Sequence, residues 1–197
     1  MGQRLVVTVK KNQEDICKLY YHWSAYTTSA LMETRDIIQW IDECEDDDLV
    51  LHLIRCAEEN GGGIKDGVDG NEWNYISRLY PDCTFKSEQI SRNNGLIAIS
   101  EDGMEEMQRW SEGDVEIDID SRTVNFMVFS GYDSLEEYET ERMDWDEDYE
   151  KQSLEDIVDI GFNLGCFDFD DIEDVIAAVE DEDFIVRNGN EIYEMIS

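Results

Sequence analysis

Residues 114–128 read DVEIDIDSRTVNFMV, and this stretch decides the fold class. Apolar side chains alternate with acidic or polar ones on both sides of the polar segment 120–122. Such alternation is the pattern of two strands that each bury one face and expose the other. The short polar connection between them predicts an antiparallel hairpin, so the chain contains a β-sheet.

The first strand of this hairpin carries four acidic side chains on one face, those of Asp114, Glu116, Asp118 and Asp120. Residues two apart on a strand are separated by about 6.8 Å. A row of like charges on a strand is locally unfavourable. Two interpretations stay open: an anion array that imitates a nucleic-acid backbone, and a solvated outer face that keeps an edge strand from pairing with another chain.

The remainder of the first 130 residues predicts more strands and helices around this hairpin. Strands are expected at 5–9, 16–21 and 95–99, the first two joined by a polar turn at 11–13. Helical periodicity places Leu31, Ile38 and Ile41 on one face of a helix at 29–43. Shorter helices are expected from the acidic cap at 46–48 to Asn60, around 73–79, and from the Ser100 cap through Trp110, with a loop opening at 61–63. The fold class is therefore α+β, a mixed sheet with flanking helices.

Acidic residues are unevenly distributed along the chain. Residues 131–197 hold 24 acidic and 3 basic residues, whereas residues 1–130 hold 26 and 12. We therefore expect an α+β domain at 1–130, an acidic connector at 131–152 and a small acidic module at 153–197. Two helices, at 153–164 and 169–180, and a hairpin of 184–186 with 192–193 around the turn Asn188-Gly189-Asn190 give this module a helix-helix-hairpin order. That order is winged-helix-like, with a charge opposite to that of a DNA-binding winged helix.

The chain of 197 residues carries a formal net charge of −35, from 50 acidic and 15 basic residues. Direct binding of nucleic acid is disfavoured, because it requires cationic side chains that release counterions from phosphates. Anionic membranes are disfavoured for the same reason, and no apolar run is long enough to span a bilayer. The charge favours a basic protein surface as partner, and the alternative is a surface adapted to solubility or high salt.

The residues expected to contact this partner form one strand and several acidic clusters closer to the carboxyl terminus. They are Asp114, Glu116, Asp118, Asp120, Asp144, Trp145, Asp146, Glu147, Asp148, Asp170, Asp171, Glu173, Asp174, Glu180, Asp181, Glu182 and Asp183. Trp145 is included because aromatic residues are enriched at interface hot spots. Residues 144–155 also match part of the ligand spacing of an EF-hand calcium loop, but Tyr149 stands where that loop needs glycine, so no metal site is expected.

Motifs for catalysis are scarce in this sequence. His22 and Ser24 lie two apart on an expected strand without a third triad member, and His52 is expected at the core or its rim. No P-loop, HExxH, GxSxG or dinucleotide fingerprint occurs. The five cysteines are scattered without a CxxC pair, which is typical of reduced thiols in a cytoplasm. We therefore expect a soluble cytoplasmic protein that is not an enzyme and binds no cofactor.

Four short segments carry a family resemblance: MGQRL at 1–5, YYHWSAYT at 20–27, GGGI at 61–64 and RNNGLI at 92–97. Together they resemble an uncharacterised group of small acidic proteins of phages and prophages of Gram-positive bacteria, over roughly residues 1–130. The resemblance implies a phage context, in which acidic proteins of this size resemble DNA-mimicking anti-restriction or anti-CRISPR inhibitors. Residues beyond 131 depart from the group.

The leading hypothesis is a phage-encoded inhibitor that binds the cationic nucleic-acid groove of a host defence protein. A second hypothesis is a sponge that sequesters a nucleotide immune signal. It depends on a pocket lined by polar tips along one face of the segment 20–26, namely those of Tyr20, His22, Ser24 and Tyr26. A third is a host-takeover factor that binds a housekeeping DNA-binding enzyme through the same acidic surface.

Overall fold

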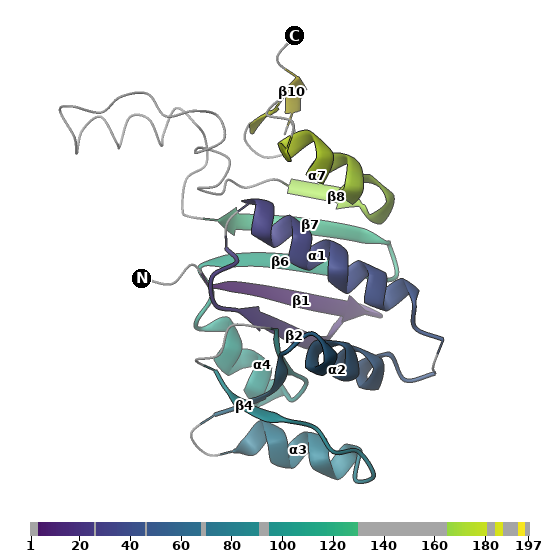
Figure 1. The fold of residues 1–197 in the computed structure, drawn as a ribbon, viewed down its shortest axis with the longest axis vertical. Coiled ribbons are helices and arrows are strands. Elements are labelled where there is room, and N and C mark those ends of the chain that lie inside the picture. Colours follow the sequence, from purple (N-terminus) through teal and green to yellow (C-terminus); the bar gives the residue numbers. More distant parts are fainter. Residues whose placement is uncertain are drawn as a thin grey trace, which may run out of the picture.

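A mixed eight-stranded sheet forms the centre of the α+β fold, in the strand order β4-β3-β5-β2-β1-β6-β7-β8 (Figure 1). The computed structural model describes residues 4–25, 27–45, 47–67, 70–90, 95–129, 165–180, 184–186 and 193–195. The strands of the sheet are β1 (Leu5–Lys11), β2 (Glu14–Tyr21), β3 (Gly63–Asp66), β4 (Ser87–Gln89), β5 (Leu96–Ala98), β6 (Gly113–Asp118), β7 (Thr123–Phe129) and β8 (Gly165–Asp168). The sheet is mixed because β1 runs antiparallel to β2 and parallel to β6.

Helices cover both faces of this sheet. They are α1 (Thr27–Asp42), α2 (Leu49–Glu59), α3 (Asn71–Leu79), α4 (Glu101–Gln108), the short 3-10 helix η1 (Phe169–Asp171) and α7 (Ile172–Glu180). Figure 1 shows α1 and α2 lying across one face. On the other face, Met107 of α4 is buried with Val6 and Tyr20 of the first two strands.

The two hairpins predicted within the first 130 residues are confirmed. β1 and β2 pair around Asn12 and Gln13, whose φ angles of 56° and 67° are those of a turn that matches the right-handed twist of the strands. β6 and β7 pair as expected, with Val115, Ile117, Val124 and Phe126 fully buried. Alternation marks β6, which buries only one face, whereas β1 and β2 are buried on both faces and were marked by their apolar runs and the polar turn between them.

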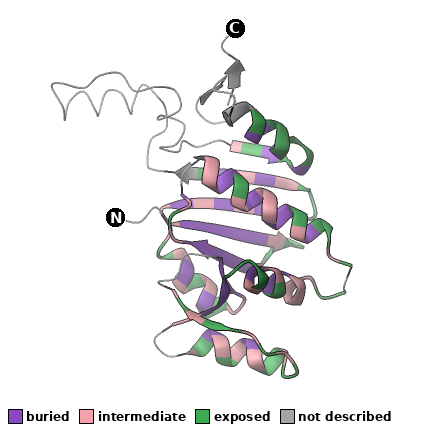
Figure 2. Cartoon of the chain, viewed as in Figure 1, coloured by how far each residue is buried: buried purple, intermediate pink, exposed green. Residues whose placement is uncertain are grey.

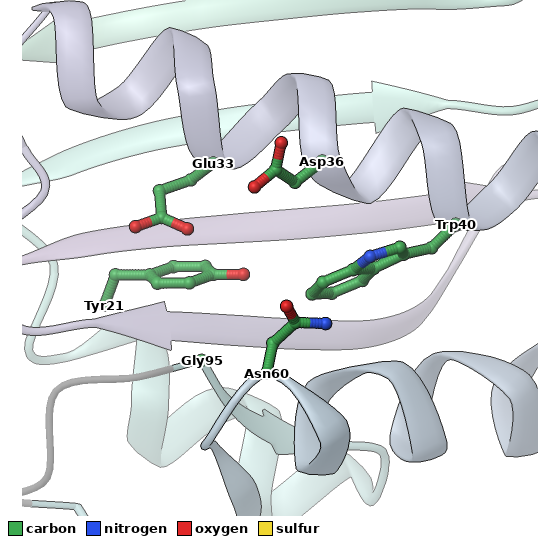
Figure 3. Close-up of a pocket in the computed structure, with 6 residues that line it drawn as sticks. All are labelled: Tyr21, Glu33, Asp36, Trp40, Asn60 and Gly95. Carbon is green, nitrogen blue, oxygen red and sulfur yellow. The ribbon is translucent and has the colours of Figure 1, made fainter.

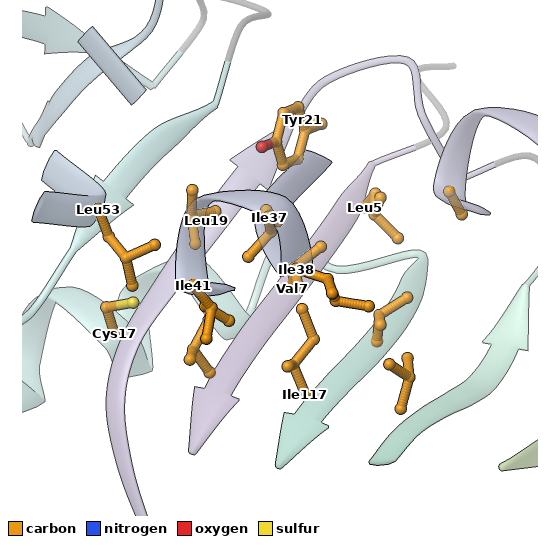
Figure 4. Packing of buried hydrophobic residues seen from close by; sticks show 14 of the residues in the cluster. Leu5, Val7, Cys17, Leu19, Tyr21, Ile37, Ile38, Ile41, Leu53 and Ile117 are labelled. Carbon is orange, nitrogen blue, oxygen red and sulfur yellow. The ribbon is translucent and has the colours of Figure 1, made fainter. Parts of the chain in front are cut away.

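The main core lies between α1, α2 and the sheet (Figures 2 and 4). Leu31, Ile38 and Ile41 are buried on the sheet-facing side of α1, as the helical period predicts. In Figure 4, Ile37 and Ile38 of α1 lie above Val7 of β1. Figure 2 shows the central strands buried along most of their length. This sandwich of apolar side chains provides most of the burial that holds the described chain together.

The helix ends follow the expected capping signals. Asp48 precedes α2 and its side chain accepts the backbone N–H of Leu51 at 3.0 Å. Ser100 caps α4 by accepting the N–H of Gly103 at 3.0 Å. Both caps satisfy donors that the first turn of a helix leaves unpaired. The helix α4 ends at Gln108, two residues earlier than expected.

A loop was expected at 61–63, but Gly63 begins strand β3, so that expectation was wrong there. A Cβ at Gly63 would lie 2.9 Å from Cγ of Glu88 in β4, so only glycine permits this close approach of two strands. The pairing is parallel, and the paired segments are far apart in sequence. A glycine-rich start and long-range pairing therefore hid β3 and β4 from periodicity.

The helix expected at 169–180 begins at Ile172, and strand β8 and η1 precede it. β8 pairs antiparallel with β7, and Phe167 of β8 packs edge-on against Phe126 with ring centroids 5.9 Å apart. The helix α7 contacts α1, and Ile172, Val175 and Ile176 join the main core. Residues 165–180 thus extend the sheet and core of the first domain.

The expected hairpin near the carboxyl terminus is present as β9 (Phe184–Val186) paired antiparallel with β10 (Tyr193–Met195). Its turn residues, the connector at 131–152 and the helix expected at 153–164 lie outside the described residues.

Candidate functional site

The acidic strand lies inside the sheet and not at its edge. β6 is flanked by β1 on one side and β7 on the other, which overturns the interpretation that its acids guard an edge strand. Val115 and Ile117 face the core, so Asp114, Glu116 and Asp118 point to the opposite face, each half-buried. The expected row on one face of the strand therefore exists for these three carboxylates, whereas Asp120 lies in the turn after β6 and was wrongly placed on the strand.

Neighbouring groups hold each carboxylate of this row. Asp114 accepts a hydrogen bond from Nε2 of Gln108 at 2.6 Å, and Glu116 lies 3.1 Å from Nζ of Lys10. The hydrogen bond between Lys10 and Glu116 is the main reason why the pKa of Lys10 is raised. Asp118 accepts the backbone N–H groups of Asp120 and Ser121 at 2.9 and 3.1 Å. The row is thus locally compensated, which explains how like charges are tolerated on one strand.

Carboxylates from several elements meet at the end of the sheet where β6 turns into β7. Arg122 in this turn donates hydrogen bonds to Asp42 at the end of α1, at 2.8 and 3.2 Å. It lies 3.9 Å from Asp170 and packs over the ring of Phe169 at 4.8 Å. The N–H of Phe169 also donates to the carbonyl of Arg122 at 3.0 Å. One arginine thereby joins three segments that are distant in sequence.

We call this end of the sheet the acidic rim. It comprises Asp42, Asp118, Asp120, Asp168, Asp170 and Asp171. The side chain of Asp170 is 94% exposed, and Asp120, Asp168 and Asp171 are exposed as well. Hydrogen bonding to Arg122 lowers the pKa of Asp42, so this carboxylate stays ionised well into acid. Most carboxylates of the rim are therefore open to solvent.

The start of α7 adds charge next to the rim. Asp170 and Asp171 precede the helix, and Glu173 and Asp174 lie in its first turn, where negative charges favour the helix dipole. Glu173 lies 3.9 Å from Nε of Arg35 on α1. The sequence identified these four acids as contact residues but missed Asp42, because only the fold brings the end of α1 beside them.

Other expected contact residues do not join the rim in the described structure. Asp114 and Glu116 lie farther along β6. Glu180 ends α7, and its side chain is not described. Outside the described residues lie Asp144, Trp145, Asp146, Glu147, Asp148, Asp181, Glu182 and Asp183.

The segment 20–26 was expected to continue as a strand with one polar face, but β2 ends at Tyr21. Tyr20 and His22 contact each other at 2.8 Å between the hydroxyl and Nδ1, and His22 and Trp23 form a turn. Ser24 instead donates to Glu33 of α1 at 3.3 Å. The predicted alignment of these polar tips was therefore wrong, because the chain turns toward α1 after Tyr21. Tyr26 is outside the described residues.

A pocket opens between α1 and the end of α2 (Figure 3). It has a volume of about 200 Å³ and is lined by Tyr21, Glu33, Asp36, Trp40, Asn60 and Gly95. Burial raises the pKa of Glu33 to about 7, an effect that the hydrogen bond from Ser24 opposes. The spacing of Glu33, Asp36 and Trp40 places them on one helix face, a signal that sequence analysis missed.

Within the residues that the structure describes, no group of three or more His, Cys, Asp or Glu side chains is placed to hold a metal ion. All five cysteines are free thiols, and burial raises the pKa of Cys17 far above its usual range. Cys56 contacts His52 at 3.4 Å on the half-buried side of α2, which agrees with the rim position expected for His52.

Comparison with known proteins identifies no relative: no family model, no curated protein and no solved structure matches this chain. Among the described helices, none has the length and apolarity needed to cross a membrane.

Proposed function

We propose that this chain is a phage-encoded inhibitor that occupies the cationic nucleic-acid groove of a host defence protein with its acidic rim. The observation that carries the proposal is the convergence of carboxylates from α1, the β6–β7 turn and the start of α7 at one end of the sheet. The phage context rests on the sequence resemblance alone. In this proposal the protein acts in the cytoplasm of a bacterial host.

The rim is suited to this role because it is built on rigid elements. Asp118 is fixed by two backbone hydrogen bonds, and Asp42 by the guanidinium of Arg122. A preorganised array of charges loses little conformational entropy when a partner binds. Its exposed carboxylates would steer a cationic groove into contact, with association that slows as salt is added.

The carboxyl-terminal region belongs to the same proposal. A winged-helix-like arrangement of α7 with β9 and β10 would place more acids beside the rim, because α7 starts there. The clusters at 144–148 and 180–183 would then enlarge the anionic surface.

The test is capture of a partner and its release by DNA. The tagged protein is incubated with lysate of a Gram-positive host that carries restriction and CRISPR systems, at low and high salt. Captured proteins are then challenged with duplex DNA and identified by mass spectrometry. We expect a nucleic-acid-binding defence protein that is retained at low salt and displaced by DNA, because both ligands need the same groove.

Two charge-matched variants make the test specific to the rim. Asp120→Lys, Asp170→Lys and Asp171→Lys are combined in one variant. Glu59→Lys, Asp82→Lys and Glu101→Lys, all exposed and away from the rim, form the control. Only the rim variant should lose the captured protein. If both variants lose the captured protein equally, binding depends on net charge alone and not on the rim. Capture of a housekeeping polymerase would favour the host-takeover hypothesis.

A further inference from the structure

The hydroxyl of Tyr21 has no hydrogen-bond partner among the described residues, although it is buried. Tyr21 is 4% exposed, and its hydroxyl points into the pocket between α1 and α2 (Figure 3). Leaving a buried hydroxyl without a partner is energetically unfavourable. A ligand in the pocket would supply the missing hydrogen bond.

The polar groups that surround this hydroxyl present mainly acceptor oxygens. Glu33 and Asp36 contribute carboxylates from α1. Asn60 donates its side-chain N–H to the carbonyl of Cys56 at 2.9 Å, which leaves its Oδ1 turned toward the pocket. A ligand that satisfies such a set must carry several hydrogen-bond donors.

Charge and size narrow the class of ligand further. Asp36 is paired with Arg35 at 2.8 Å, so Glu33 is the carboxylate that lacks a cationic partner in the pocket. A phosphate group would be repelled by the unpaired carboxylate of Glu33, which counts against the nucleotide sponge. The volume of about 200 Å³ lies below the ~300–1,000 Å³ typical of sites for drug-sized ligands. The ring of Trp40 at one side provides a surface on which a flat or compact cation can lie.

We propose that this pocket binds an organic cation, a guanidinium or primary ammonium group, which pairs with Glu33, donates a hydrogen bond to the Tyr21 hydroxyl and lies against Trp40. The cation has two possible sources, a free small amine or an Arg or Lys side chain of a partner protein. The inference is independent of the proposed function, because no residue of the acidic rim lines the pocket.

Binding of the cation is coupled to the proton on Glu33. Of the groups that line the pocket beside Glu33, Asp36 on α1 is ionisable and already paired with Arg35, Tyr21 on β2 has a raised pKa, and Asn60 at the end of α2 is uncharged. Only ionised Glu33 attracts the ligand. Affinity should therefore fall about tenfold per pH unit below pH 7 and level off above it.

The experiment is a titration of the full chain with butylammonium and with a blocked Gly-Arg-Gly peptide. Binding is measured by calorimetry and by the shift of the indole N–H signal of Trp40 in NMR spectra. 1-Butanol and adenosine monophosphate are the neutral and anionic controls. We expect the two cations to bind and to release protons at pH 7, whereas the controls leave the Trp40 signal in place. If the peptide binds more tightly than butylammonium, the source of the cation is a partner's side chain. If butylammonium binds more tightly, the source is a free amine.

Two isosteric variants test the assignment, with Glu43→Gln as a control that removes the same charge from an exposed position just after α1. Glu33→Gln should weaken cation binding at least about tenfold and abolish its pH dependence. Tyr21→Phe should weaken it by up to about tenfold, since a hydrogen bond to a charged group is lost. Glu43→Gln should leave it unchanged. Absence of binding by both cations, or binding of adenosine monophosphate at the Trp40 signal, would overturn the proposal whatever the rim variants show.

Discussion

The guanidinium of Arg122 donates two hydrogen bonds to the carboxylate of Asp42, at 2.8 and 3.2 Å, and so fastens the β6–β7 turn to the end of α1. Both side chains are about half exposed, at 50% and 46%. Solvent and salt therefore weaken the pair, even though its geometry is bidentate. The contact sets the shape of the acidic rim more than it sets the stability of the fold.

Replacement of Arg122 should accordingly have a small effect on folding. We expect Arg122→Ala to lower the free energy of unfolding by roughly 0.5–1 kcal/mol in urea titrations at low salt, and by less at high salt. Arg109→Ala breaks an exposed pair between the residue that follows α4 and Glu105 of this helix, and serves as the control. A loss of several kcal/mol would show that Arg122 holds the core together, which the exposed geometry does not predict.

Glu33 gives the protein a distinctive dependence of stability on pH. Its pKa rises to about 7 in the folded state, above the value of 4.5 expected when the chain is unfolded. The folded state then binds more protons between these values, so the contribution of this group falls as the pH rises from about 4.5 to 7. Glu33→Gln should therefore stabilise the protein by roughly 1–3 kcal/mol at pH 8 and little at pH 4.5.

Urea unfolding of wild type, Glu33→Gln and Glu43→Gln at the two pH values checks this prediction. The free energy of unfolding of Glu43→Gln should differ from that of the wild type by the same amount at both pH values. Equal stabilisation by Glu33→Gln at both pH values would show that burial does not raise the pKa of Glu33.

Glu72 is a buried carboxylate that joins α3 to the start of α4. It is 1% exposed and accepts the backbone N–H groups of Ile99 and Ser100 at 2.5 and 3.0 Å. Glu72→Ala would leave these donors without their acceptor and should lower the free energy of unfolding by roughly 2–4 kcal/mol. Hydrogen exchange at the two amides should accelerate, whereas Asp82→Ala in an exposed turn should change neither measurement.

The net charge of −35 predicts that the fold is stabilised by salt. Mutual repulsion among the carboxylates opposes compaction, and added ions screen it. The melting temperature should rise as sodium chloride is added from low to physiological ionic strength, with most of the gain at the low end. A melting temperature that is independent of salt would mean that local pairs, such as that of Lys10 with Glu116, already neutralise the field.

Sequence patterns predicted the parts of the fold in which one local segment buries one face. The β6–β7 hairpin and the helix α1 have this property, and the β1–β2 hairpin, buried on both faces, was marked by its apolar runs and polar turn. β3, β4 and β8 have three or four residues each, and their partner strands are far away in the chain, so no local period marks them. The same holds for the candidate site. The acidic clusters could be read from the sequence, whereas the contact of Arg122 with Asp42 and the pocket at Tyr21 depend on how the elements pack.

The sheet ends in two short strands, β4 with three residues and β8 with four. A short edge offers few free backbone groups, so a foreign strand gains little by aligning with it. Recognition by strand addition is accordingly disfavoured at both borders. We therefore expect a partner of the described sheet to contact its side chains and not to extend its main-chain pairing.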